Sequence, residues 1–225
     1  MHRRSSACGL VRPYALPDTM QPLVAASFVE RTADGARFAF DGGWECRIFV
    51  LGIDLVRVLL VPPDGLREPR TWMVAPGDVD APWEGRNRLD VSAFPRPPFD
   101  VETGEHTIVL QTEALRVVVR LRPFGIEWSV PGEHTFAADR STQAYDWSRR
   151  SATVRHYMAR RSSDRYFGLG DKTGPLDKHG RRLRTVALDA LGHDAETSDP
   201  LYKHWPFLIT HDAANEVAYG LFYDT

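Results

Sequence analysis

The side chains best suited to binding a ligand lie between residues 189 and 205. They are the carboxylates Asp189, Asp194, Glu196 and Asp199 and the aromatic rings of Tyr202 and Trp205. A carboxylate can accept two hydrogen bonds from adjacent sugar hydroxyls, and an aromatic ring offers an apolar face with a polar tip. Two carboxylates about 5–5.5 Å apart are also what retaining glycoside hydrolysis requires, although spacing along a loop does not establish a distance.

Asp189 differs from the other three acids in its surroundings along the chain. Its neighbours are the apolar residues Val186, Ala187, Leu188, Ala190 and Leu191. An acid in an apolar setting needs a partner or a functional role, so Asp189 is the main candidate for contacting a substrate. Asp194, Tyr202 and Trp205 are weaker candidates. For Asp189, a structural role remains open as well.

A purely structural interpretation is also available for Asp194, Glu196 and Asp199. Asp side chains commonly hydrogen-bond the backbone of turns, and Asp199 is followed by Pro200, as is typical of a turn.

All of these residues belong to a long irregular segment, 165–207. Glycines, prolines and acids alternate there with single aromatics, which excludes a long helix. Loops of this length are usually either functional or disordered. The apolar anchors argue against disorder; they are Tyr166, Phe167, Leu201, Tyr202, Trp205 and Phe207. We therefore predict a short strand followed by an ordered loop that presents polar groups.

The loop opens with the run Phe167-Gly168-Leu169-Gly170-Asp171. Its two glycines are not a dinucleotide-binding fingerprint, because a third glycine and a following helix are missing. The run instead predicts a strand that ends in a turn with positive φ angles, with Asp171 hydrogen-bonding the loop backbone.

Several other functions are disfavoured by the sequence. The eight histidines have no metal-ligand spacing, and no Gly-x-Ser-x-Gly, Cys–His pairing or phosphate-binding loop occurs, so we expect neither a metal nor another cofactor. A net charge of -2 argues against nucleic-acid binding, and the basic run 181–184 is interpreted as a solvated loop.

The two cysteines, Cys8 and Cys46, give no disulfide framework. An export signal and an apolar run of about 18 residues, as a membrane span needs, are not found. We expect a cytoplasmic protein that contacts neither membrane nor nucleic acid.

The rest of the chain is patterned for β-structure. Residues 1–22 are predicted to be a loose arm, and residues 23–225 a single domain. Alternating apolar and polar residues predict strands, with turn signals between them; these strands are 36–40, 44–50, 55–61, 106–111, 115–122, 124–130, 153–160, 205–210 and 217–223. Short edge strands are predicted at 72–74 and 89–91. The expected fold is an all-β antiparallel β-sandwich with long loops.

Four segments of the C-terminal region, in this order, resemble glycoside hydrolase family 31, the α-glucosidase and α-xylosidase family. They are Tyr166-Phe167-Gly168-Leu169-Gly170-Asp171-Lys172-Thr173-Gly174-Pro175-Leu176-Asp177, Asp189-Ala190-Leu191-Gly192-His193-Asp194, Asp199-Pro200-Leu201-Tyr202-Lys203 and Tyr219-Gly220-Leu221-Phe222-Tyr223-Asp224. The chain departs from the family pattern at Asp171, where Glu is usual, at Ala187-Leu188, and at His193, where Tyr is frequent.

The resemblance implies a galactose-mutarotase-like N-terminal sandwich that packs on a (β/α)8 barrel and extends a loop over the active site. It implies that the aspartate matching Asp189 binds hydroxyls of an α-linked oligosaccharide or glycoside. Both catalytic aspartates of the family lie on the barrel, and the nucleophile motif Asp-Met-Asn-Glu does not occur in this sequence. We therefore expect no catalytic residue in this chain and no hydrolysis by the chain alone.

Two alternatives remain. The first is a free-standing carbohydrate-binding module. The second is an aldose-1-epimerase, which needs a general acid and a general base facing one sugar ring. His106, His134 and His156 lie in the strand region, but no motif of that family accompanies them, so this alternative ranks last.

Overall fold

The structure, a computed structural model, describes residues 20–74, 76–77, 79–148 and 153–224. In these residues the only helical element is the short 3-10 turn η1, Asp41–Gly43, which follows a strand at the predicted turn. All named strand pairs are antiparallel. The all-β prediction is therefore confirmed.

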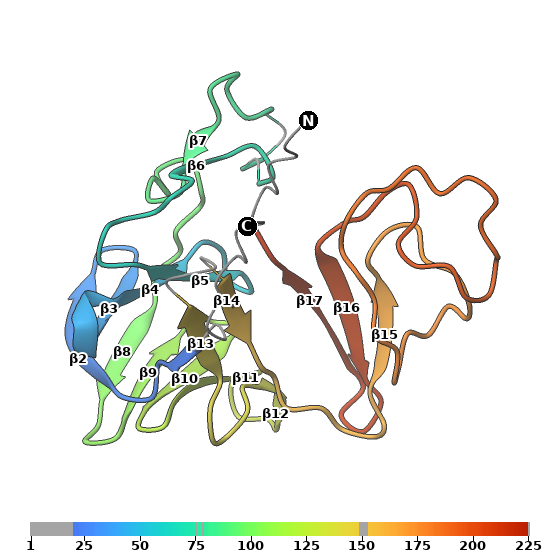
Figure 1. Cartoon of the computed structure of the whole chain (residues 1–225). Coiled ribbons are helices and arrows are strands. Elements are labelled where there is room, and N and C mark those ends of the chain that lie inside the picture. The colour runs from blue at the N-terminus through green and yellow to red at the C-terminus, as the bar shows by residue number, and fades with distance from the viewer. Residues whose placement is uncertain (1–19, 75, 78, 149–152, 225) are drawn as a thin grey trace, which may run out of the picture.

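Two antiparallel sheets form the sandwich (Figure 1). The first has the order β2-β3-β4-β5, with β2 Ala26–Thr32, β3 Gly35–Phe40, β4 Glu45–Val50 and β5 Val56–Val61. The second has the order β12-β11-β10-β9-β8, with β8 Asp100–Thr103, β9 Thr107–Gln111, β10 Arg116–Leu121, β11 Phe124–Ser129 and β12 Thr135–Ala138. Strands that follow one another in sequence are also neighbours in space, as short turns require.

The core lies between these sheets and is built by alternate residues of each strand, because successive side chains point to opposite faces. Val117 and Val119 of β10 are buried, as are Phe38 of β3 and Ile48 of β4. Phe124 is wholly buried and contacts the rings of Phe38, Phe40 and Tyr145. The alternation read from 115–130 is thus confirmed as the inner face of β10 and β11.

A smaller sheet closes one side of the sandwich. It consists of β1 Gln21–Pro22, β13 Tyr145–Ser148 and β14 Thr153–His156, in the order β1-β13-β14. Gln21 and Pro22, the last residues of the segment expected to be an arm, pair with Trp147 and Asp146. Residues 1–19 lie outside the described part of the chain.

The predicted edge strands at 72–74 and 89–91 are wrong. The strands of that excursion are β6 Arg70–Thr71 and β7 Arg86–Asn87. Trp72 does not pack as a strand residue. Its indole nitrogen donates to the carbonyl of Trp83 and its ring lies against Gly85, so the apolar residues stabilise a hairpin loop. The sequence pattern also does not predict the strands β1, β2, β8, β12 and β13.

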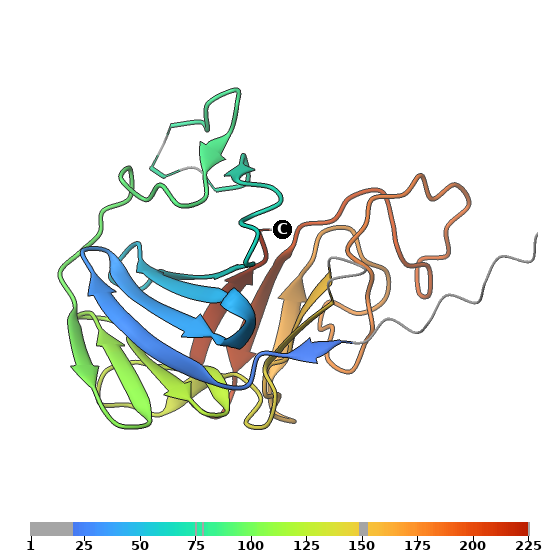
Figure 2. The ribbon, with the colours of Figure 1, turned by 60° about the vertical axis from the view of Figure 1, so that its left-hand side comes forward.

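A further sheet stands beside the sandwich in Figure 1, and its red strands are seen partly behind the sandwich in Figure 2. It is the sheet β15-β16-β17, with β15 Arg165–Gly168, β16 Phe207–Asp212 and β17 Val217–Phe222. Residues 169–206, between β15 and β16, form a large loop on the side away from the sandwich (Figure 1).

Buried polar contacts fix this sheet to the sandwich. Arg161 forms an ion pair with the fully buried Asp212 of β16 and also donates to the carbonyl of Thr135 on β12. His156 bridges Asp139, at 2.7 Å, and the hydroxyl of Tyr223, at 2.8 Å. The base of the loop therefore has a defined place relative to the core.

We predict that Phe124→Ala lowers the free energy of unfolding by about 3–5 kcal/mol, because it opens a cavity among three aromatic rings. Trp83→Ala removes a larger side chain that is 92% exposed and should change the value by less than about 0.5 kcal/mol. Urea unfolding followed by tryptophan fluorescence or circular dichroism compares the two. Equal losses would contradict the assignment of the core.

Candidate functional site

The loop starts with a turn that only a glycine-rich sequence accommodates. Gly168, Leu169 and Gly170 have φ values of 101°, 68° and 80°. The amide of Leu169 donates to the carbonyl of Phe207 at 3.0 Å, and the amide of Asp171 donates to the carbonyl of Lys203 at 3.0 Å. The predicted turn with positive φ is confirmed, and its function is to bring the two ends of the loop together.

A buried ion pair then joins both ends of the loop. The ammonium of Lys172, whose side chain is 0% exposed, lies 3.2 Å from Asp199. The other carboxylate oxygen of Asp199 accepts the amide of Arg184 at 2.6 Å. Burial alone would raise the pKa of Asp199, but the Arg184 amide and the Lys172 ammonium outweigh it and hold the pKa below its usual value. Asp199 is therefore a structural residue of the loop.

A second junction holds the first half of the loop against β15. Asp177 accepts the amides of Tyr166 and His179, both at 3.0 Å, and pairs with Arg165 at 2.9 Å. These hydrogen bonds, led by that of the Tyr166 amide, lower the pKa of Asp177 to about 2. The ammonium of Lys178 donates to the carbonyl of Pro175 at 2.6 Å.

The basic run 181–184 is not simply solvated. Arg181 donates to the carbonyl of Thr173, and Arg184 donates to the carbonyl of Asp199. These two guanidinium groups satisfy backbone acceptors of the loop. Arg184 is nevertheless exposed, as expected for a solvated run, whereas Arg181 is half-buried.

Asp194 caps a turn. Its Oδ1 accepts the amide of Glu196 at 3.0 Å and both the amide and the hydroxyl of Thr197 at 2.8 Å. These bonds, led by that of the Thr197 hydroxyl, lower the pKa of Asp194. The structure thus agrees with the interpretation of Asp194 as a residue that hydrogen-bonds the backbone of a turn.

Asp189 lies between two contacts to the same neighbouring segment. Before it, the amide of Leu188 donates to the carbonyl of Leu201 at 3.0 Å. After it, the hydroxyl of Tyr202 donates to the carbonyl of Ala190 at 3.1 Å. The Asp189 carboxylate is exposed, and in the described part of the chain it makes neither a hydrogen bond nor an ion pair.

The apolar neighbours of Asp189 do not enclose it. Leu188 is 54% exposed and Leu191 is 83% exposed, and Val186 is exposed as well. The apolar setting that the sequence gives Asp189 is therefore not a buried setting in the described chain. Exposed apolar residues flank a carboxylate that has no partner here.

The structure brings Tyr202 to the Asp189 segment but leaves Trp205 at the base of the loop. The Trp205 amide lies 3.4 Å from the carbonyl of Leu169, and its ring lies against Gly170. Among the described residues, no hydrogen bond, ion pair or ring contact joins Trp205 to Asp189. The sequence gives no local signal for the Tyr202 hydrogen bond, because its acceptor is a carbonyl twelve residues away.

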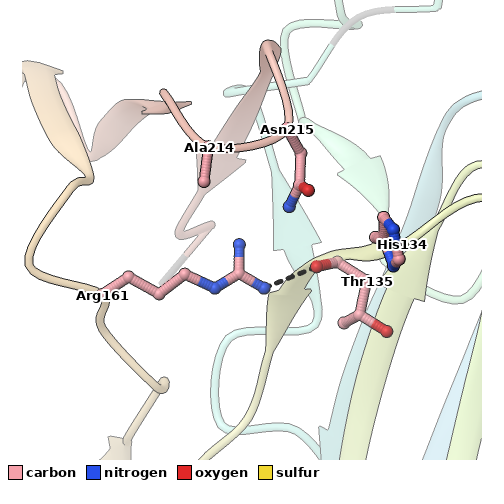
Figure 3. A pocket seen from close by; sticks show the side chains of 5 residues that line it. All are labelled: His134, Thr135, Arg161, Ala214 and Asn215. Atoms are coloured by element: carbon pink, nitrogen blue, oxygen red, sulfur yellow. Dashed lines mark hydrogen bonds between the residues drawn. The ribbon is translucent and has the colours of Figure 1, made fainter.

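A hollow of about 520 Å³ lies elsewhere, lined by His134, Thr135, Arg161, Ala214 and Asn215 (Figure 3). It is open and shallow, and its guanidinium is already bonded to Thr135 and Asp212. None of the predicted site residues lines it. Within the described ranges, no group of three or more His, Cys, Asp or Glu residues could hold a metal ion. No helix there is long and apolar enough to span a membrane.

Comparison with known proteins decides the family. Residues 45–225 match the glycosyl hydrolase 31 N-terminal galactose mutarotase-like domain. The chain belongs to this family. The resemblance read from the loop segments is confirmed, and the sandwich is of the galactose-mutarotase-like type.

Relatives of this family 31 domain are longer proteins. It is 29% identical over 126 residues to α-glucosidase 2 of Bacillus thermoamyloliquefaciens. The aligned residues make up 55% of this chain and 15% of that protein. A family 31 dextranase of Flavobacterium johnsoniae, in complex with isomaltotriose, has a similar fold, with a TM-score of 0.70 and 19% identity over 91% of this chain and 23% of its own. A family 31 α-xylosidase of Xanthomonas citri has a TM-score of 0.57 and 17% sequence identity to this chain. The match covers 87% of this chain and 19% of the xylosidase. This family 31 domain thus spans less than a quarter of each.

We predict that Gly170→Ala loosens the loop more than Gly180→Ala. Both glycines have positive φ, 80° and 75°, so both variants carry similar backbone strain of about 1–2 kcal/mol. A Cβ at Gly170 would lie 2.9 Å from the carbonyl oxygen of Lys203, whereas one at Gly180 meets open space. Limited proteolysis of residues 170–205 should be faster in Gly170→Ala only. Equal cleavage of the two variants would contradict the close backbone approach.

A pH dependence is expected from Asp177. Its folded pKa of about 2 is below the ordinary value of 3.8, so its stabilising contribution is fully present above pH 4 and is lost as the pH falls toward 2. Asp177→Asn should lower the urea midpoint at pH 5, and the difference from the parent chain should shrink by pH 2.5. A difference that stays constant between these pH values would contradict the hydrogen-bonded carboxylate.

Proposed function

We propose that this domain supplies one side of the active site of a retaining α-glycosidase whose catalytic aspartates lie on a (β/α)8 barrel. Asp189 accepts hydrogen bonds from hydroxyls of the bound α-linked oligosaccharide. The observation that carries the proposal is the Asp189 carboxylate, exposed and without a partner in the described chain, on a segment held at both of its ends.

The surface around Asp189 is suited to contact with a second domain. Leu188, Leu191 and Tyr202 expose apolar area beside the carboxylate. Exposed apolar groups that gather with polar ones mark ligand-binding or protein–protein contact sites. A barrel packed against this loop would cover the leucines and leave Asp189 facing the substrate between the two domains.

The relatives support the class of ligand. The Flavobacterium johnsoniae enzyme is a dextranase in complex with isomaltotriose, and the Listeria monocytogenes cycloalternan-forming enzyme is in complex with a pentasaccharide substrate. The Bacillus thermoamyloliquefaciens relative is an α-glucosidase. We therefore propose an α-linked glucan or glucoside as the substrate of this protein.

In this arrangement the residues of the chain bind and orient the sugar, and they do not cleave the glycosidic bond. Retaining hydrolysis needs a nucleophile and an acid/base carboxylate about 5–5.5 Å apart. Asp194 and Asp199 are committed to the loop backbone and to Lys172. The bond-breaking chemistry is therefore assigned to the barrel.

The positions of the three candidate histidines do not support an epimerase activity. Both ring nitrogens of His156 are bonded, one to Asp139 and the other to Tyr223. His106 is 82% exposed beside Glu105 on a hairpin, and His134 lines the hollow around Arg161. None of the three is paired with a glutamate across a sugar-sized cavity in the described residues.

The first test is the coding sequence that follows residue 225. A barrel carrying Asp-Met-Asn-Glu supports the proposal, and a following region with no barrel favours the free-standing carbohydrate-binding module. That module would bind maltose-type sugars saturably as an isolated chain, which calorimetry at millimolar sugar measures.

We predict that Asp189→Ala, in the protein that carries the barrel, raises KM for an α-glucoside by about 10- to 100-fold, as expected for lost hydrogen bonds to a charged group. Glu196→Ala removes another exposed acid of the same loop and should leave KM within about twofold. The 225-residue chain alone should release no nitrophenol from aryl α-glucosides or α-xylosides. Unchanged KM in Asp189→Ala, or turnover by the chain alone that Asp189→Ala abolishes, would contradict the proposal.

A further inference from the structure

Tyr202 follows a firmly held part of the loop. It follows Asp199, which pairs with the buried Lys172, and Leu201, which is buried. The carbonyl of Leu201 accepts the amide of Leu188 at 3.0 Å. The carbonyl of the next residue, Lys203, accepts the amide of Asp171, so Tyr202 extends from a backbone that is fixed on both sides.

The side chain of Tyr202 is directed to the Asp189 segment rather than to open solvent alone. Its hydroxyl donates to the carbonyl of Ala190 at 3.1 Å. Its ring meets the ring of His193 edge-on, with the centroids 6.0 Å apart. The hydroxyl that could have met a sugar is thus committed to the backbone next to Asp189.

The Leu188 and Tyr202 hydrogen bonds enclose Asp189 between them. The first lies one residue before it and the second one residue after it, and both end on the segment 201–202. With one of them removed, the backbone at Asp189 would be tied on one side only, and the direction of its carboxylate would no longer be set.

We propose that Tyr202 is a positioning residue: its hydroxyl holds the carbonyl of Ala190 so that Asp189 is presented to the sugar. Tyr202 acts through Asp189 and not by contacting the substrate itself. The proposal rests on the function proposed above for Asp189 and adds the group that keeps this carboxylate in place. It also replaces the expectation that Tyr202 is a ligand-contacting aromatic residue.

The experiment compares Tyr202→Phe with the parent chain. Phenylalanine keeps the ring and its contact with His193 and removes only the hydroxyl. Amide hydrogen exchange at Leu188, the hydrogen-bonded amide next to Asp189, should become about two- to tenfold faster, the range expected for one lost hydrogen bond. The carbonyl 13C resonance of Ala190 should also move, because its donor is gone.

Tyr157→Phe is the matched control. It removes a tyrosine hydroxyl that donates over the same distance, 3.1 Å, to Asp146 in the sandwich. This variant should leave exchange at Leu188 and the Ala190 resonance unchanged. Unchanged exchange at Leu188 in Tyr202→Phe would overturn the proposal.

Kinetics of the barrel-carrying protein separate positioning from direct contact. Tyr202→Phe should raise KM severalfold with kcat nearly unchanged. In the Asp189→Ala background it should add nothing, because it acts through that carboxylate. A full additional rise in KM would overturn the proposal, since Tyr202 would then contact the sugar by itself. An Asp189→Ala variant with normal KM contradicts the proposed function instead, and that result does not involve Tyr202.

Discussion

The buried ion pair between Lys172 and Asp199 is the contact on which the candidate site depends. It joins Lys172, near the start of the loop, to Asp199 in its second half, and the Lys172 side chain is not exposed to water. A buried charge that loses its partner is strongly destabilising, so neither end of the loop can move away at low cost. Leu201 and Tyr202 follow this junction directly, and through them the segment of Asp189 is held.

The ion pair can act in this way because the sheet beneath it is itself anchored. Arg161 reaches from the end of the sandwich to Asp212 of β16, and His156 connects Asp139 with Tyr223 at the end of β17. Asp212 and Asp139 are both buried, so each carboxylate would be left without a partner in the interior if its contact were lost, which is costly. The sandwich core, the anchored sheet and the loop thus form one continuous support.

Much of this fold could be predicted from residue patterns. The alternation at Val117 and Val119 predicts the inner face of β10, and Gly168 and Gly170 predict the turn that closes the loop. Edge strands such as β2 were missed because most of its residues remain in water and give no clear alternation. Asp189 illustrates the other limit. Its apolar neighbours suggest burial, yet they are exposed in the described chain. Whether Asp189 is covered depends on residues far along the chain or on another domain. The composition of the neighbouring residues gives no information about such contacts.

The central claim is that Asp189 faces a sugar across a domain boundary. A crystal structure of the protein with its barrel and bound isomaltotriose tests it most directly. We predict that the Asp189 carboxylate lies within about 3.2 Å of at least one sugar hydroxyl, with Leu188 and Leu191 covered by the barrel. A bound sugar that Asp189 does not touch, with this loop still open to solvent, would contradict the claim.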